Sequence, residues 1–170
     1  LYFLSSSTRK YGQFAVSKFA NYLLQNNINV TNALYVGIAG DPPGGEYAPL
    51  FPNSKFTTFD LDKVWKPDIV GDITNTTFIS NIWDLIICVQ VMEHISNLWE
   101  LPTELLRITK PGGSIIIDCP WNYPYHAEPP SFGDYWRISK DGFRVLFKDF
   151  SIVDIISTEH NTSCLLRKND

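Results

Sequence analysis

Residues 83–95 read WDLIICVQVMEHI, a nearly continuous run of apolar side chains between charged ones. A strand with one solvated face alternates apolar and polar residues, whereas a strand covered on both faces of a parallel sheet is apolar throughout. The run is too short to cross a membrane, which takes about 20 apolar residues. We therefore expect it to form the central strand of an α/β sheet.

Helical and strand patterns alternate before this run. An amphipathic helix is expected over residues 11–27, with its apolar face formed by Phe14, Ala15, Phe19, Tyr22 and Leu23. Three short strands are then expected in NALYVGIAG (32–40), KFTTFDLD (55–62) and PDIVGDI (67–73). A further helix is expected from Gly45 to just before Pro52.

The same alternation continues after the run. The expected elements are a helix in NLWELPTELLRIT (97–109), a strand in GSIIIDCP (113–120), a helix in SKDGFRVLFKDF (139–150), and strands in SIVDIIST (151–158) and TSCLLRK (162–168). The last two strands are joined by EHN, which is short enough for a hairpin, so the last strand should be antiparallel. Only KVWKP (63–67) separates the second and third strands, too little for a crossover helix.

These patterns predict an α/β fold with a doubly wound, mostly parallel seven-stranded sheet, an antiparallel last strand, helices on both faces and a shortened connection between strands 2 and 3. The 170 residues suit a single domain. We expect an N-terminal helical segment (1–32), a cofactor-binding core (33–120), an acceptor-side loop (121–137), and a final helix and hairpin (138–170). In such sheets a ligand binds beyond the carboxyl ends of the strands.

Composition excludes several classes of function. The net charge is −4 and the 14 Lys and Arg residues are scattered, so no nucleic-acid partner is expected. The three cysteines lack C-x-x-C spacing, which predicts neither a disulfide framework nor a zinc site, and we expect no metal. No membrane span or basic-then-apolar leader is recognisable, and the expected location is cytoplasmic.

The turn after the first expected strand reads LYVGIAGDPPGGEY over residues 34–47. Gly37 ends the strand where the chain turns sharply, and a ligand can approach a glycine closely because it has no Cβ. Gly44 and Gly45 open the expected helix, whose free amide groups favour an anion. Asp60 follows Gly37 at about the 20-residue spacing of an acid that binds ribose hydroxyls. The pattern indicates a nucleoside cofactor with an anionic group; a plain turn with solvated acids is the alternative.

Two acids in this turn discriminate between cofactors. Asp41 and Glu46 bring negative charge to the place that a pyrophosphate would occupy, which disfavours a nicotinamide-dependent oxidoreductase. S-adenosylmethionine fits better, because its adenosine takes an acid at the ribose and its methionine ammonium takes acids or carbonyl groups near the first turn.

Six segments carry a family resemblance: VGIAG (36–40), TFDLD (58–62), DIVGDI (68–73), WDLIICVQVMEHI (83–95), LLRITKPGGSIIIDCPW (105–121) and DYWRISKDGF (134–143). In this order they resemble the class I, Rossmann-like S-adenosylmethionine-dependent methyltransferases, and most closely the type-11 methyltransferase domains. The resemblance extends over about residues 33–147.

The resemblance implies contacts with S-adenosyl-L-methionine. Residues 37–40 would line its methionine portion, together with Gln90, and Asp60 would bind the ribose hydroxyls. Asp72 matches the acid near the adenine amino group, with Ile73 against the ring. The expected cofactor-binding residues are Gly37, Ile38, Ala39, Gly40, Asp41, Glu46, Asp60, Leu61, Asp72, Ile73 and Gln90.

The acceptor should enter beside the loop WNYPYHAEPPSFGDYWR (121–137). His126 is the candidate catalytic base, because histidine titrates near neutral pH; an ordinary loop histidine is the alternative. Trp136 and Arg137 either contact the acceptor or pin the loop to the sheet, with Asp134 bracing Arg137. The candidate substrate contacts are Tyr125, Tyr135, Trp136 and Arg137.

The loop and the central strand lead to two hypotheses. The spacing from H-x-E-P-P to DYWR resembles type-11 domains of glycan and natural-product assembly, so the first is O-methylation of a sugar, glycan or other small molecule. Tyr35 and Ala39 replace an acid and a glycine of the family pattern, so the second is a binding or scaffolding domain without catalysis, alone, as a homodimer or with other domains. Glu93 and His94 begin the connection after the central strand, where His94 is expected to brace the turn.

Overall fold

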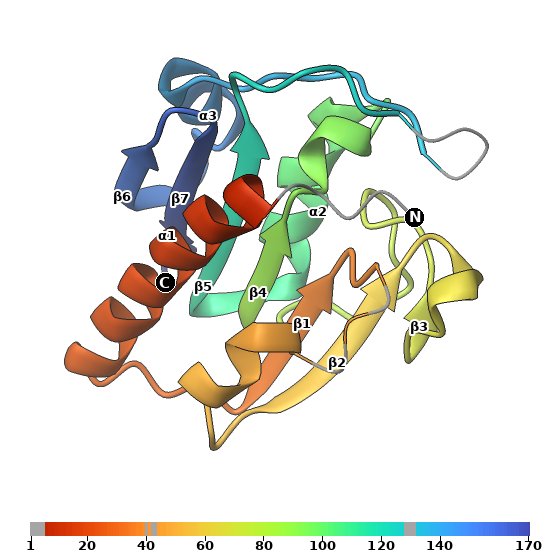
Figure 1. Cartoon of the computed structure of the whole chain (residues 1–170). Coiled ribbons are helices and arrows are strands. Elements are labelled where there is room, and N and C mark those ends of the chain that lie inside the picture. The colour runs from red at the N-terminus through yellow and green to blue at the C-terminus, as the bar shows by residue number, and fades with distance from the viewer. Residues whose placement is uncertain (1–5, 40, 42–43, 128–131) are drawn as a thin grey trace.

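The protein is built on one seven-stranded sheet (Figure 1). The computed structural model describes residues 6–39, 41, 44–127 and 132–170. The strand order is β3-β2-β1-β4-β5-β7-β6; neighbours from β3 to β5 are parallel, and β7 is antiparallel to both β5 and β6. The strands are β1 Asn32–Val36, β2 Lys55–Asp60, β3 Ile69–Val70, β4 Trp83–Val89, β5 Thr109–Pro120, β6 Ser151–Ser157 and β7 Asn161–Arg167. The predicted sheet is confirmed, including its antiparallel last strand.

Helices cover both faces of the sheet, as predicted. The α-helices are α1 Ser6–Gln25, α2 Leu101–Ile108 and α3 Lys140–Leu146, and the 3₁₀ helices are η1 Gly45–Leu50, η2 Lys63–Trp65, η3 Met92–His94 and η4 Leu98–Glu100. In Figure 1, α1 and η1 lie on the face toward the viewer, and α2 and α3 lie behind the sheet. No helix in the described part of the chain is long and apolar enough to cross a membrane.

The central strand β4 is buried on both of its faces. Ile86 and Cys88 pack into the apolar cluster that contains α2 and α3, while Leu85 and Ile87 pack into the cluster that contains α1. None of these four side chains has any exposed surface. This double burial explains why the strand sequence is apolar without alternation.

The structure corrects several predicted boundaries. The buried face of α1 is formed by Ala15, Val16, Phe19, Ala20 and Leu23, whereas Phe14 and Tyr22 are exposed. Strand β5 begins at Thr109 and not at residue 113, because Thr109 pairs with Trp83 at the start of β4; its pairing with β7 begins at Ser114. The segment between β2 and β3 holds only the short 3₁₀ helix η2, which confirms the minimal connection.

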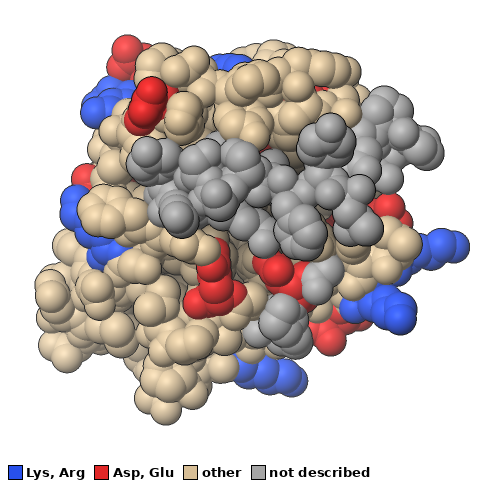
Figure 2. Space-filling view, in the orientation of Figure 1, with Lys and Arg blue, Asp and Glu red and all other residues tan. Residues whose placement is uncertain are grey.

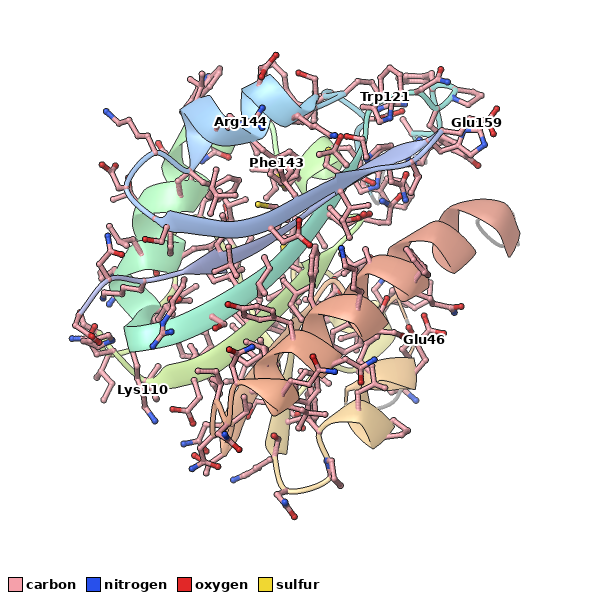
Figure 3. The ribbon with its side chains drawn as sticks, turned by 90° about the vertical axis from the view of Figure 1, so that its left-hand side faces the viewer. Glu46, Lys110, Trp121, Phe143, Arg144 and Glu159 are labelled. Atoms are coloured by element: carbon pink, nitrogen blue, oxygen red, sulfur yellow. The ribbon has the colours of Figure 1, made fainter. Side chains whose placement is uncertain are left out.

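The carboxyl ends of β1, β2, β4 and β5 meet at one edge, where residues 121–127 and 132–137 of the predicted acceptor-side loop also lie (Figure 1). Figure 3 shows the direction of β5, with Lys110 at its beginning and Trp121 just beyond its end. Trp121 Nε1 donates a hydrogen bond to the Thr158 carbonyl oxygen (2.9 Å), which ties the start of this loop to the β6–β7 hairpin.

Asp84 joins three strands at the opposite edge of the sheet. Its Oδ2 accepts hydrogen bonds from the backbone N–H of Thr31 (3.1 Å) and Asn32 (2.8 Å), and its Oδ1 accepts from Lys110 Nζ (2.6 Å). Partial burial raises the pKa of Asp84, but the hydrogen bonds from Lys110, Thr31 and Asn32 outweigh that effect and lower it to about 2.

We predict that Asp84→Asn lowers the free energy of unfolding by about 1–3 kcal/mol at pH 7, because the amide cannot replace every bond to the carboxylate. A carboxyl with a lowered folded-state pKa stabilises the protein above its unfolded pKa, so the difference should shrink between about pH 4 and pH 2. Urea unfolding at several pH values measures this difference in the free energy of unfolding. Asp141→Asn is the control, since Asp141 is exposed and forms an ion pair with Arg144, which Figure 3 labels on the surface of α3. Equal effects of both substitutions would contradict this role of Asp84.

Candidate active site

The turn after β1 is held in a conformation that favours glycine. Gly37 has φ +74°, and a Cβ there would lie 2.3 Å from Val91 Cγ2 in the segment that follows β4. Gly37 N–H donates to the Phe59 carbonyl oxygen of β2 (2.9 Å). Ala39 also has a positive φ, of 45°. The turn is thus packed between β2 and β4, with Ile38 buried beneath it, whereas Gly40 lies outside the described residues.

Tyr35 brings an acid to this turn. The Tyr35 hydroxyl donates a hydrogen bond to Asp41 Oδ2 (2.9 Å), and its ring meets the Tyr47 ring edge-on at 5.8 Å. The predicted helix from Gly45 is the six-residue 3₁₀ helix η1, too short for the helix-dipole argument made from the sequence. The exposed Glu46 on η1 accepts a hydrogen bond from Gln13 of α1. Figure 3 shows Glu46 on this side of the molecule, beside α1.

Asp60 points from the end of β2 to the turn after β1. Its Oδ2 accepts from the backbone N–H of Ala39 (3.4 Å), and its Oδ1 accepts from that of Asp62 (2.9 Å). Asp60 is half-buried, and the neighbouring Leu61 is exposed. The structure therefore brings the predicted ribose-binding acid together with the glycine turn.

Asp72 and Ile73 follow β3 on the same edge. Asp72 is exposed, and its Oδ1 accepts from both the backbone N–H and the hydroxyl of Thr74 (2.8 Å each). Ile73 is buried in the main apolar cluster. Since β3 pairs with β2 at Asp60, Asp72 and Asp60 lie at adjacent strand ends.

Gln90 ends β4 in a left-handed conformation with φ +57° and is bonded to β5 twice. Its backbone N–H donates to the Asp118 carbonyl oxygen (3.2 Å), and its side-chain amide donates to Asp118 Oδ1. The Ser163 hydroxyl of β7 donates to Asp118 Oδ2. Burial raises the pKa of Asp118 to about 6, although the bonds from Ser163 and Gln90 act against it. Asp118 is not among the residues predicted from the sequence, although an acid inside the apolar run of β5 was an available signal.

A second cluster joins Glu93 and His94 of η3 to His126 of the acceptor-side loop. One ligand-type atom of each residue lies within 4.8 Å of those of the other two. Glu93 is fully buried, and burial raises its pKa well above the usual range. The rings of His94 and His126 meet edge-on at 5.0 Å. An adjacent Glu-His pair after the central strand was the sequence signal for this cluster, but the sequence could not show that residues 32 positions further along return to it.

Asp134 fixes the position of His126. Its Oδ2 accepts from the backbone N–H of His126 (2.7 Å) and lies 3.1 Å from His126 Nδ1, while Arg137 donates to both carboxylate oxygens (2.5 and 2.7 Å). Partial burial raises the pKa of Asp134, but these bonds from Arg137 and His126 outweigh it and lower the pKa to about 2. The predicted bracing of Arg137 by Asp134 is confirmed.

The remaining candidate substrate residues divide into two groups. Trp136 Nε1 donates to the Ile95 carbonyl oxygen (2.7 Å), and Arg137 also donates to the carbonyl oxygens of Tyr123 and Pro124 (2.8 Å each), so both pin the loop. Tyr125 and Tyr135 are exposed, at 76% and 55%. Only these two tyrosines present most of their ring to solvent.

Charge on the face of the molecule that carries α1 is scattered. In Figure 2, Lys and Arg side chains stand apart around the rim of this face, and several Asp and Glu side chains lie nearer its centre. Among the residues drawn in colour, this face has no continuous basic patch for a phosphate backbone.

Comparison with known proteins points in one direction. A family model described as a methyltransferase domain matches residues 47–117, from η1 into β5. An uncharacterized methyltransferase of Mycobacterium tuberculosis is 34% identical over 53 residues, which cover 31% of this chain and 21% of that protein. This chain therefore matches about a fifth of the length of that relative.

Solved structures share the whole fold. A protein from Pyrococcus horikoshii is 14% identical with a TM-score of 0.73, over 98% of this chain and 93% of that one. The N-methyltransferase NodS from Bradyrhizobium japonicum, in complex with S-adenosyl-L-homocysteine, is 12% identical with a TM-score of 0.64, over 96% and 99% of the two chains. At these identities the likeness concerns the fold.

We predict that Asp118→Asn changes the pH dependence of stability. A carboxyl whose folded-state pKa is raised is tolerated in its protonated form and destabilises the protein once it ionises. The unsubstituted protein should therefore lose stability as pH rises from about 4 to about 6. The free energy of unfolding of Asp118→Asn relative to the unsubstituted protein should therefore rise by about 2–3 kcal/mol between pH 4 and pH 7. Chemical denaturation at these two pH values tests this, with the exposed Asp141→Asn as control. A difference that does not change with pH would contradict the prediction.

Proposed function

We propose that the protein transfers the methyl group of S-adenosylmethionine to a hydroxyl oxygen of a sugar, glycan or other small molecule, because a methyltransferase-domain model matches residues 47–117 and solved methyltransferases share its fold. One observation carries this proposal: the family match runs over β2, β3 and β4 and includes Asp60, Asp72 and Gln90, which stand at the carboxyl ends of these strands on one edge of the sheet.

The cofactor would lie along that edge. Asp60 accepts hydrogen bonds from the ribose hydroxyls beside the turn of residues 37–40. Asp72, Ile73 and the exposed Leu61 contact the adenine. The methionine portion reaches Gln90, and its ammonium group reaches Asp41 or Glu46. Asp41 is the better placed of these two acids, because Tyr35 orients its carboxylate over the turn.

The acceptor hydroxyl would meet His126. Its Nδ1 is directed to Asp134, so its Nε2 accepts the hydroxyl proton while the oxygen attacks the methyl carbon and the carbon–sulfur bond breaks in line. The electron pair of that bond stays on sulfur, which gives S-adenosylhomocysteine. Tyr125 and Tyr135 offer exposed aromatic faces for a sugar ring, whereas Trp136 and Arg137 act by holding the loop.

Hydroxyl methylation is supported over other acceptors by the histidine pair, since a hydroxyl must lose its proton whereas an unprotonated amine need not. The three cysteines are buried and unpaired, which suits the reducing environment of the cytoplasm.

A binding or scaffolding role is the second candidate. It is favoured by the bonds that already occupy both acids of the turn, from Tyr35 to Asp41 and from Gln13 to Glu46. A domain of this kind would show no affinity for the cofactor.

We predict that Asp60→Ala weakens S-adenosylmethionine binding at least tenfold, since two ribose hydrogen bonds to a charged acceptor are lost. Titration calorimetry with S-adenosylmethionine and S-adenosylhomocysteine measures the affinity. Asp62→Asn is the matched control, because Asp62 lies in the same loop and its Oδ1 accepts a hydrogen bond from the Val64 N–H (2.9 Å). Unchanged affinity in Asp60→Ala would reject the cofactor placement. No binding by the unsubstituted protein at millimolar ligand would favour the scaffold.

We predict that His126→Ala lowers methyl transfer by about 10²-fold or more and leaves the Kd for S-adenosylmethionine unchanged. The measurement is S-adenosylhomocysteine release with a panel of monosaccharides and glycosides. His160→Ala is the control, because His160 lies in the β6–β7 hairpin and its Nδ1 faces the Asn122 carbonyl oxygen (3.1 Å). Equal turnover of the two variants would show that His126 does not act on the acceptor.

A further inference from the structure

Three side chains converge beyond the end of β4 on a space that the cofactor assignment does not use. From the geometry of Glu93, His94 and His126 we propose that these residues bind a divalent transition-metal ion, which receives the hydroxyl groups of the acceptor. The metal site is independent of the cofactor assignment; its role toward the acceptor rests on the proposed function.

Glu93 is the first reason. Its side chain has no exposed surface, and neither carboxylate oxygen has a hydrogen-bond partner among the described residues. A buried polar group without a partner costs roughly 1–3 kcal/mol, and a buried charge without one costs more. A cation beside the carboxylate removes this cost, because it supplies the missing opposite charge and accepts the oxygen lone pairs.

The protonation of His94 is the second reason. Its Nδ1 lies 2.5 Å from the Gly133 carbonyl oxygen, an atom that can only accept, so Nδ1 carries the proton. The other nitrogen, Nε2, then has a free lone pair, and it lies 3.7 Å from Glu93 Oε1.

His126 repeats this arrangement from the other side. Its Nδ1 lies 3.1 Å from Asp134 Oδ2 and 3.2 Å from the Pro124 carbonyl oxygen, both acceptors, and 3.5 Å from the donor Arg137 Nη2; the two closer acceptors place the proton on Nδ1. Its Nε2 is buried and has no hydrogen-bond partner among the described residues. A carboxylate bonded to the far nitrogen of a histidine is the usual support of a metal-binding imidazole, since it fixes the ring and increases its basicity.

The spacing and the donor set fit a small divalent ion. One ligand-type atom of each residue lies within 4.8 Å of those of the other two, and a metal with bonds of about 2.0–2.2 Å would draw the three side chains together by small rotations. Two imidazoles and one carboxylate suit zinc, manganese, iron or cobalt rather than calcium, which takes oxygen ligands. Three protein ligands also leave positions on the ion open.

Those open positions define the acceptor. The side chains of His94 and His126 keep 19% and 16% of their surface exposed, so the ion would be reached from the loop side. A vicinal diol, as in a sugar ring, fills two open positions with its two hydroxyl oxygens. The metal lowers the pKa of the bound hydroxyl, whose proton passes to solvent; the oxygen then bonds the methyl carbon as the carbon–sulfur bond breaks. In this form of the mechanism His126 is a ligand and not the base.

The test is metal binding by the full chain after removal of ions with a chelator. Titration calorimetry with zinc chloride, and visible absorption with cobalt chloride, should show one ion per chain at micromolar affinity or tighter. Glu93→Gln keeps the shape and the burial of the side chain but removes its charge, and we predict that it weakens binding by about 10–100-fold, with a similar loss in His126→Ala. His160→Ala should bind as the unsubstituted protein does.

Two results would overturn the proposal. One is the absence of ion binding at millimolar zinc or cobalt by a chain whose thermal unfolding is intact. The other is binding that Glu93→Gln and His126→Ala leave unchanged, because the ion would then sit elsewhere. The thermal unfolding midpoint of Glu93→Gln shows whether this variant folds. His126→Ala tests a second metal-ligating side chain independently.

Failure here is separate from failure of the proposed function. If S-adenosylmethionine binds and sugar methylation continues in excess chelator, the metal proposal is wrong and His126 remains the base. If the ion binds but the cofactor does not, the metal site stands and the methyltransferase assignment fails. A preference for acceptors with vicinal hydroxyls over their mono-deoxy analogues, lost in excess chelator, is the expected result.

Discussion

The burial of β4 on both faces determines where polar groups can stand in this protein. Residues 85–88 have no exposed surface, so a polar side chain within that stretch would lose its hydration without a partner. The polar residues of this part of the chain are therefore confined to the two ends of the strand. Asp84 at the beginning joins β1, β4 and β5, and Gln90 and Glu93 at the other end meet the loop that follows β5.

This confinement concentrates acid groups at the carboxyl edge. Burial is the main cause of the raised pKa of Glu93, and the neighbouring charge of Asp118 raises it further. Asp118 differs from Glu93 because Gln90 and Ser163 donate to its two oxygens. One buried carboxyl is thus part of the sheet's hydrogen bonding, while the other has no hydrogen-bond partner among the described residues. A group of the second kind is retained at a cost in stability, which is the signature expected of a site for a positively charged ligand.

The sequence predicted those features of the fold that depend on local apolar patterns and on the lengths of connections. The double burial of β4, the mostly parallel seven-stranded sheet and the hairpin at EHN all follow from apolar runs and connection lengths, and the structure has each of them. The order of the strands in the sheet was not predicted. The glycine turn and Asp60 were also predicted to meet. The apolar face of α1 was partly wrong, because helical spacing alone does not distinguish the buried Val16 from the exposed Phe14. The meeting of Glu93 with His126 could not be predicted, since it depends on the path of an irregular loop that has no period to read.

A single carboxylate joins two parts of that loop. Asp134 receives the guanidinium of Arg137 and the backbone N–H of His126, so it joins two parts of the loop that are otherwise separate. The same oxygen that accepts this N–H also faces His126 Nδ1 and leaves Nε2 as the reactive atom. The position of the loop and the chemical state of its histidine therefore depend on the same group. A substitution at Arg137 would therefore act on His126, because both side chains are held by Asp134 and by the Pro124 carbonyl oxygen.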